Sequence, residues 1–350
     1  MPRAKVTRLF FTAIYPVSFE ECGYRTALTF GRGHEQQFRA CRARHSDGCR
    51  NDQRIDRVCA DHGSHDRSRE VVVTAGGAGH ATFNGRPTLE LRIGESRALI
   101  LEYGAHVASW VARGREQLYL SPAAEYVEGR PIRGGIPICF PQFDLLGSLP
   151  KHGFARTISW GVDSLNADAD HATAVLSIVD NDAIRAMWPH AFRLSLTVRL
   201  TRDDLDLSMT VENFDADAFE FTGALHTYLC VDDVEASTLH GLEGCAYRDH
   251  RTSVDDRHPT SPGVKLSAIG RTYQSPADAL ELRGGEHAFS IAGQGFENVV
   301  VWNPGADLNF HDLPPDGWRR FVCVEAAQVQ RPIRVEAGQR WTGGQRLHLI

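Results

Sequence analysis

The sequence predicts an all-β protein, built as a large antiparallel β-sandwich with very little helix. Apolar and polar residues alternate with a period of two in many segments, which is the pattern of strands with one buried face. Turn-forming residues separate these segments, and only Asp182–Trp188, stopped by Pro189, has a helical pattern. Many short strands with almost no helix indicate packed β-sheets.

Strands are expected along the chain from about Ala81 onward. The clearest pair is Phe192–Leu200 and, after a turn at 201–204, Leu205–Val211, with apolar side chains at every second position. This pair predicts a long antiparallel hairpin with one buried and one solvated face. In chain order, the other expected strands are Thr88–Ile93, Arg97–Tyr103, His106–Val111, Ala174–Val179, Phe219–Leu229, Val299–Asn303, Phe321–Ala326 and Arg340–Leu349.

Residues 1–80 differ in composition from the rest of the chain. The stretch Gly31–Glu70 has few apolar residues, many Arg, His and Asp residues, and no periodicity. Such a composition cannot bury enough apolar surface to order itself. We therefore expect residues 1–80 to be an atypical extension, either disordered or misannotated, and residues 81–350 to form one β-sandwich domain.

Two further interpretations of this extension remain open. The apolar run Leu9–Tyr15 follows basic residues, as in a signal peptide, but it is short, precedes Pro16 and lacks a small-x-small cleavage site. A second group combines residue types that bind zinc, although its spacings miss the usual paired-cysteine pattern. The members of this group are Cys49, Cys59, His62 and His65.

Charge and cysteine content exclude several classes of protein. The net charge is −6 over 350 residues; the first 70 hold 13 Lys and Arg against 9 Asp and Glu, and the remainder hold 25 against 35. An acidic body argues against nucleic acid as a partner, and no apolar run approaches the ~18 residues of a membrane span. The eight cysteines form no regular framework, which indicates free thiols and a cytoplasmic protein.

Two loop segments combine glycine with basic residues. The first, RGGIPICFPQF, begins with Arg133, and the second, KHGFAR, contains Lys151, His152 and Arg156. Glycine permits close backbone approach, and guanidinium groups suit phosphate oxygens. Each segment also has a purely structural interpretation, the first as a tight crossover loop and the second as a solvated basic turn.

Two strand segments carry a polar group that ordinary packing does not explain. In FEFTGALHTYL, His226 lies on the polar face, where a side chain that titrates near neutrality is a candidate acid or base. In FVCVEAA, Glu325 follows an apolar run, and a buried carboxylate requires a partner or a shifted pKa. The structural alternatives are a histidine hydrogen-bonded to a neighbour and a glutamate paired with an arginine.

Taken in this order, the four segments resemble the aldose 1-epimerase superfamily, and most closely its glucose-6-phosphate 1-epimerase branch. Supporting pieces are Tyr103–Val107 and Val301–Pro304, and the resemblance spans Ala81 to Ile350. It implies the galactose mutarotase-like β-supersandwich and an isomerase that interconverts the α and β anomers of hexose 6-phosphates. It also implies a reaction with no cofactor and no metal, in a monomer or weak homodimer.

The resemblance further implies roles for individual residues. His226 becomes the catalytic acid and Glu325 the catalytic base of ring opening and closure. The sugar phosphate is then bound by residues of the two loop segments, which form a local positive well in an acidic protein. These residues are Arg133, Arg156, Lys151, His152 and Gln142.

Two positions depart from the family pattern. Asp144 stands where the family usually has glycine, and Gly270 stands where it usually has a substrate-binding aspartate; Asp232 or Asp233 is the candidate replacement. The missing aspartate favours an alternative in which the protein binds sugar phosphates without catalysis. A mutarotase for unphosphorylated aldoses is the other alternative, and the basic cluster argues against it.

Overall fold

The computed structural model describes residues 77–258, 263–274 and 276–350. The chain divides into two units, Met1–Ser64 and His65–Ile350, and every described residue belongs to the second. The apolar run and the cysteine–histidine group of the extension therefore lie outside the described residues. The first described strand, β1, begins at Ala78, slightly before the start expected at Ala81.

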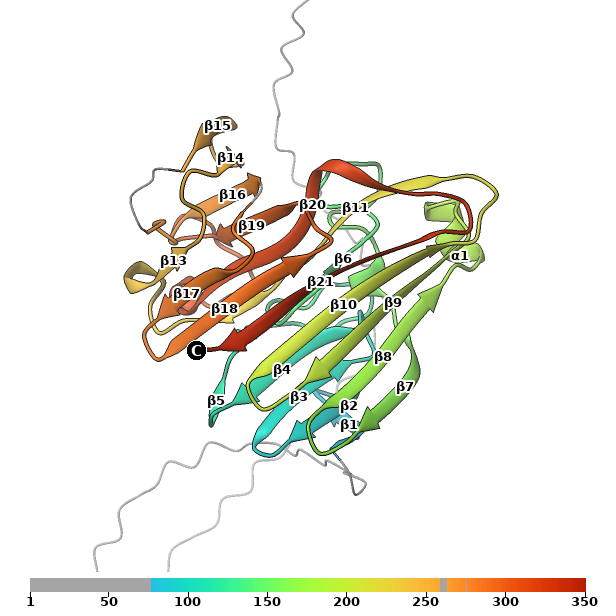
Figure 1. Ribbon diagram of the computed structural model, residues 1–350, viewed down its shortest axis with the longest axis horizontal. Helices are drawn as coiled ribbons and strands as arrows, with labels where there is room; N and C mark the ends of the chain where they lie inside the picture. The colour runs from blue at the N-terminus through green and yellow to red at the C-terminus, as the bar shows by residue number, and fades with distance from the viewer. Residues whose placement is uncertain (1–76, 259–262, 275) are drawn as a thin grey trace, which may run out of the picture. The chain divides into compact units, whose positions relative to one another are not determined.

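The all-β prediction is confirmed by three sheets in which every strand pairing is antiparallel (Figure 1). Within the described part of the chain, no helix is long and apolar enough to cross a membrane. The helical segments are short: η1 (Ala155–Thr157), α1 (Asp182–Met187), η2 (Val234–Ala236) and η3 (Gly317–Arg320).

The largest sheet orders its eight strands as β13-β17-β18-β21-β10-β9-β8-β7. Its central hairpin is the one that the alternating pattern predicts, with Leu200 paired to Leu205. One side-chain face of β9 and β10 is buried and the other is half-exposed, as the alternation requires. The strands are β7 (Gly161–Ala167), β8 (Ala172–Val179), β9 (Phe192–Leu200), β10 (Asp204–Asn213), β13 (Thr238–His240), β17 (Leu280–Gly284), β18 (His287–Gln294) and β21 (Arg340–Leu349).

A five-stranded meander packs against one end of this sheet. Strands β2 and β3 lie against β8 and β9, and Leu89, Leu91 and Ile100 are fully buried in the shared core. Burial of such apolar side chains is the main stabilising term of the sandwich. The strands are β1 (Ala78–Phe83), β2 (Arg86–Ile93), β3 (Ser96–Leu101), β4 (His106–Ala112) and β5 (Arg115–Glu116).

The third sheet positions the candidate site. Its order is β15-β14-β16-β19-β20-β11-β6, and β12 also pairs with β20. Strand β20 contacts β10 and β21 of the largest sheet, so its inner residues join the same core. The strands are β6 (Ile138–Cys139), β11 (Phe219–Leu225), β12 (Tyr228–Cys230), β14 (Ala246–Asp249), β15 (Val254–Arg257), β16 (Ile269–Gln274), β19 (Asn298–Asn303) and β20 (Phe321–Val335).

Some elements differ from the sequence-based expectation. The expected strand Phe219–Leu229 is broken between β11 and β12, because the Thr227 N–H bonds to the Leu225 carbonyl (3.0 Å) and turns the chain. Strand β20 continues beyond the expected end at Ala326 to Val335. This second half contains Gln328 and Pro332, which interrupt the apolar pattern by which a strand is predicted. The break matters most, because it lies at His226.

Candidate active site

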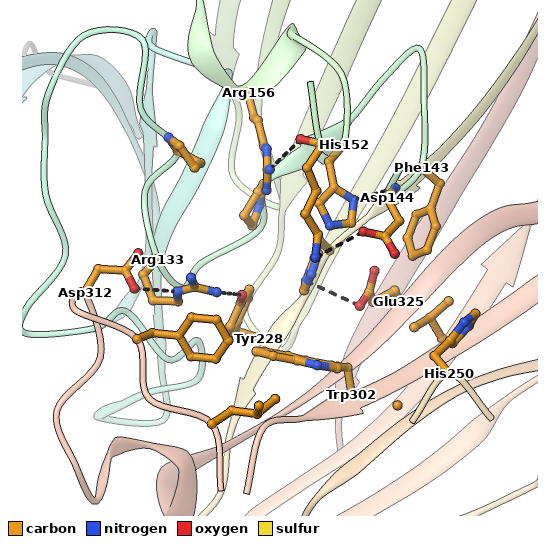
Figure 2. A pocket seen from close by; sticks show the side chains of 18 of the residues that line it. Arg133, Phe143, Asp144, His152, Arg156, Tyr228, His250, Trp302, Asp312 and Glu325 are labelled. Atoms are coloured by element: carbon orange, nitrogen blue, oxygen red, sulfur yellow. Dashed lines mark hydrogen bonds and ion pairs between the residues drawn. The ribbon is translucent and has the colours of Figure 1, made fainter. Parts of the chain in front are cut away.

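The candidate site is a cavity of about 460 Å³ over the third sheet (Figure 2). A volume in this range suits a small ligand. Its walls come from the loops before and after β6, the β14–β15 turn, strands β16 and β19, and the loop that leads into β20. Of the predicted site residues, the cavity brings together Arg133, Lys151, His152, Arg156, His226 and Glu325.

Strand pairing places His226 beside Glu325. Glu325 lies in β20 opposite Val300 of β19, and Leu225, the last residue of β11, lies opposite Ala326. The chain then turns, and the Thr227 carbonyl accepts from the Val324 N–H (3.1 Å). His226 Nδ1 is thereby held 3.4 Å from Glu325 Oε1.

Both groups are buried, and burial shifts their protonation in opposite directions. Burial, followed by the charges of Arg156 and Arg133, lowers the pKa of His226 well below its usual value. Burial, followed by the charge of Asp144, raises the pKa of Glu325 well above its usual value. Low dielectric disfavours either charged form, so burial favours a neutral imidazole beside a protonated carboxyl group.

This pair keeps unused hydrogen-bonding capacity. His226 Nδ1 and Glu325 Oε2 are both shielded from solvent, and neither has a hydrogen-bond partner among the residues that the structure describes. Buried polar atoms are rarely left without partners unless a ligand or a reaction uses them. The arrangement can therefore move a proton between two sites on a bound molecule.

The two basic loops are joined to each other. The Phe140 N–H donates to the His152 carbonyl (3.2 Å), and Phe140 forms a parallel bridge with Gly153. Gly153 has a φ of 71°, and a Cβ atom there would lie 2.1 Å from the Phe140 carbonyl oxygen, so only glycine fits. The two loops thus lie side by side, and Arg133 and Arg156 both line the cavity.

The cations of this cavity are not equivalent. Arg133 donates to Asp312 (3.1 Å) and to the Tyr228 hydroxyl (3.2 Å), and its guanidinium lies over the Phe310 ring. Arg156 donates to the Lys151 carbonyl (2.8 Å), and no carboxylate pairs with it in the described part of the chain. Its buried Nε also lacks a partner there.

Lys151 and His152 contribute less positive charge than the sequence suggests. Lys151 Nζ lies 3.1 Å from Asp144 Oδ1 and is paired with it. His152 Nδ1 accepts from the Asp144 N–H (3.1 Å), and burial lowers the pKa of His152 far below its usual value. A neutral ring that accepts at Nδ1 carries its proton on Nε2, so His152 is an uncharged donor.

Three residues considered from the sequence do not line this cavity. The Gln142 amide donates to the Asp144 and Leu149 carbonyls (2.9 and 3.1 Å) and so holds a loop in place. Asp232 accepts from the Glu286 N–H, and Asp233 pairs with Arg319. The suggestion that Asp232 or Asp233 replaces the missing aspartate is therefore wrong, because their carboxylates are bound elsewhere.

The structure adds cavity residues that the sequence did not indicate. His250 and Arg251 come from the β14–β15 turn, and the His250 N–H donates to the Gly270 carbonyl (2.7 Å). Tyr228 stacks on His226, with ring centroids 5.0 Å apart. The sequence did not indicate this turn, because β15 is exposed throughout and so lacks the alternation of apolar and polar residues that marks a strand.

One group in the described residues has the composition to hold a metal ion. The ligand atoms of His226, Cys323 and Glu325 lie within 4.8 Å of one another, and all three residues are buried. Imidazole, thiolate and carboxylate together suit a zinc-like ion. Such an ion would be bound by both His226 and Glu325.

We expect the stability of Glu325→Gln relative to the wild type to increase as the pH rises above about 4.3. With a folded-state pKa above the unfolded value, Glu325 holds its proton in the native state while the unfolded chain has lost it. The free energy of unfolding therefore falls as pH rises above the unfolded pKa of about 4.3, and glutamine lacks this penalty. Melting temperatures of both proteins should diverge between pH 4.5 and pH 8, with the variant higher; a pH-independent difference would contradict the burial argument.

The fold of this chain is similar to that of a solved mutarotase-like protein. A crystal structure described as a "putative mutarotase" from Salmonella typhimurium superposes with a TM-score of 0.73 and 25% identity. The match covers 81% of this chain and 96% of that one. The class of protein is thus a mutarotase-like β-sandwich, which confirms the predicted fold.

Proteins that are similar in sequence identify the family within this fold class. A protein named "Putative glucose-6-phosphate 1-epimerase" from Cenchrus ciliaris is 32% identical over 260 residues, covering 70% of this chain and 79% of its own. One of the same name from Escherichia coli is 33% identical over 242 residues, covering 66% and 80%. The family model for aldose 1-epimerase matches residues 87–348, and the chain belongs to the aldose 1-epimerase family.

Proposed function

We propose that the protein is a glucose-6-phosphate 1-epimerase, an isomerase that interconverts the α and β anomers of hexose 6-phosphates. One observation carries the proposal: the buried His226–Glu325 pair opens into the same cavity as Arg156, a cation without a carboxylate partner in the described residues. An acid–base pair supplies the chemistry, and an uncompensated guanidinium supplies a phosphate site. The family membership and the names of the relatives support this assignment.

The reaction needs one proton to leave the sugar and one to enter it. In the reactive form Glu325 is a carboxylate and His226 is protonated, which differs from the neutral pair only by transfer of the carboxyl proton to the imidazole. Glu325 removes the proton of the C1 hydroxyl while His226 donates to the ring oxygen. The C1–O5 bond breaks, a C1 aldehyde forms, and the ring is open.

Ring closure reverses these transfers. Rotation about the C1–C2 bond presents the other face of the aldehyde to the C5 hydroxyl. His226 takes back the proton of that hydroxyl as the C–O bond forms, and Glu325 returns its proton to the C1 oxygen. The protein ends in its starting protonation state, so the cycle balances.

The phosphate is bound at the rim that carries Arg156 and Arg133. Arg156 is the principal anchor, because its charge is not already neutralised by a described carboxylate. Arg133 is held rigidly by Asp312 and Tyr228 and offers its remaining N–H groups. The neutral His152 donates from Nε2 to a sugar oxygen.

Mutarotation of freshly dissolved α-glucose 6-phosphate tests the function directly. Polarimetry should show acceleration by the purified protein, with a much higher kcat/KM than for α-glucose. Binding of glucose 6-phosphate in calorimetry without acceleration would instead support the non-catalytic alternative. Equal rates for both sugars would support a mutarotase for unphosphorylated aldoses.

We also propose that the protein acts in the cytoplasm as a monomer or weak homodimer. Among the described residues, Cys139, Cys230 and Cys323 are free thiols, which agrees with a reducing compartment.

A further inference from the structure

Asp144 is a cavity carboxylate that the proposed mechanism does not use. Its φ of 48° is a left-handed conformation that aspartate tolerates better than most residues. Its N–H donates to His152 Nδ1 (3.1 Å), and its carbonyl accepts from the His152 N–H (2.9 Å) and from the Gln142 amide (2.9 Å). The side chain therefore extends from a backbone that is fixed on both sides.

The carboxylate of Asp144 has unused acceptor capacity. Oδ1 is shielded from solvent and has no well-aligned hydrogen bond within the described residues, although Lys151 Nζ lies 3.1 Å away. The side chain as a whole is 43% exposed, and it is exposed into the cavity. A carboxylate offers about four lone-pair sites, so the ion pair leaves acceptors for a ligand.

Asp144 lies near the acid–base pair, on the side away from Arg133. Figure 2 shows Arg133 at the left of the cavity and Asp144, Glu325 and His250 to its right, with Glu325 below Asp144. The negative charge of Asp144 raises the pKa of Glu325 and acts in the same direction on His250, which agrees with proximity to both.

The chemistry of the sugar ring then determines what faces Asp144. The anomeric carbon has two ring neighbours, the ring oxygen and C2. The ring oxygen belongs to the His226 side, and C5 beyond it carries the C6 phosphate toward the arginines. C2 and its hydroxyl therefore point away from Arg133, to the side of the cavity on which Asp144 lies.

We propose that Asp144, oriented by Lys151, accepts a hydrogen bond from the C2 hydroxyl of the bound hexose phosphate and selects for sugars that carry it. This assignment rests on the proposed function. In this arrangement Lys151 orients the carboxylate that binds the sugar ring and does not bind the phosphate, because the charge of Lys151 is already balanced by Asp144.

Gly270 explains why the acceptor is needed at Asp144. Gly270 lies in β16 at the cavity wall, and a Cβ atom there would make only ordinary 3.7 Å contacts with Arg251 and Trp302. A larger side chain would therefore fit at position 270. Because the residue is glycine, β16 contributes no carboxylate to the cavity at this position. Asp144 supplies one from the facing loop.

A comparison of two substrates isolates this contact. We would measure the catalysed kcat/KM of glucose 6-phosphate and of 2-deoxyglucose 6-phosphate, and their Kd values by calorimetry. The protein should prefer glucose 6-phosphate by about 10- to 100-fold, which is the range for a charge-assisted hydrogen bond to a partly exposed group. Asp144→Gly should remove most of this preference, and Asp144→Asn, whose amide still accepts, should retain part of it.

Controls separate this contact from other effects. Asp255→Asn removes a carboxylate from an ion pair outside the cavity, with Arg248 at 2.9 Å, and should leave the preference unchanged. Intrinsic differences between the two sugars are common to every variant and cancel. Equal losses for both substrates in Asp144→Gly, in kcat/KM and in Kd, would overturn the assignment. Failure of the proposed function looks different, because neither sugar phosphate would then be accelerated, while the ratio of Kd values would still test Asp144.

Discussion

Glu325→Gln is expected to lower kcat for the mutarotation of glucose 6-phosphate by about 10²- to 10⁴-fold, the range for loss of a positioned acid or base. Glutamine keeps the volume and hydrogen-bonding shape of the buried side chain but cannot take the proton of the C1 hydroxyl. KM and the calorimetric Kd should change little, because the phosphate contacts lie elsewhere in the cavity. Polarimetry at saturating substrate measures the effect.

Two further sets of variants test whether the loss of turnover comes from the acid–base pair. His226→Gln should cause a loss of similar size, and the double variant should be little worse than either single one, because the two groups act as a unit. Glu220→Gln replaces an exposed glutamate of β11 that pairs with Arg334, and should leave kcat unchanged. Wild-type turnover in both Glu325→Gln and His226→Gln would refute the acid–base assignment.

Arg156→Ala is expected to raise KM for glucose 6-phosphate by about 10- to 100-fold while KM for glucose changes little. A charge-assisted hydrogen bond contributes about 1.5–3 kcal/mol, and Arg156 is the rim cation without a described carboxylate partner. Arg133→Ala should have a smaller effect, because Asp312 already balances much of that charge. If the phosphate binds equally in ground and transition states, kcat should be nearly constant.

Salt and a conservative replacement sharpen this test. The effect of Arg156→Ala should shrink between 0.1 M and 1 M salt, as the Debye length falls from ~10 Å to ~3 Å. Arg156→Lys should keep part of the affinity, since it retains the charge but not the planar fork. Arg248→Ala, outside the cavity, is the matched control. An Arg133→Ala, Arg156→Ala double variant with the wild-type preference for the phosphorylated sugar would show that the phosphate binds elsewhere.

The sequence reveals the fold where burial is one-sided. Strands β9 and β10 alternate because one face packs on the core and the other faces water, so the ends of β9 were predicted correctly and those of β10 to within two residues. Strand β15 is exposed throughout, and the far half of β20 mixes glutamine, proline and arginine. Neither leaves a periodic signal, because tertiary pairing rather than local pattern holds these residues in strands.

The sequence indicated six of the cavity residues, but it missed His250 and Arg251 and did not show how the charges pair. His226 and Glu325 stand out in the sequence because polar groups interrupt apolar strands, and the structure brings them within 3.4 Å of each other. That Lys151 is neutralised by Asp144, and that Gln142 holds a loop rather than facing the cavity, depends on contacts between side chains. No spacing rule encodes such contacts.

The position of β21 has a consequence for how the protein is made. This strand is the last in the described sequence, yet it lies between β18 and β10 in the interior of the eight-stranded sheet (Figure 1). Until Arg340–Leu349 has left the ribosome, the sheet is two separate pieces with unpaired inner edges. Gln345 of this strand also meets Thr227 at the turn that presents His226. Nascent chains are therefore expected to remain inactive and open to faulty pairing until synthesis of this strand is complete, and a chaperone that covers strand edges would protect them most in that interval.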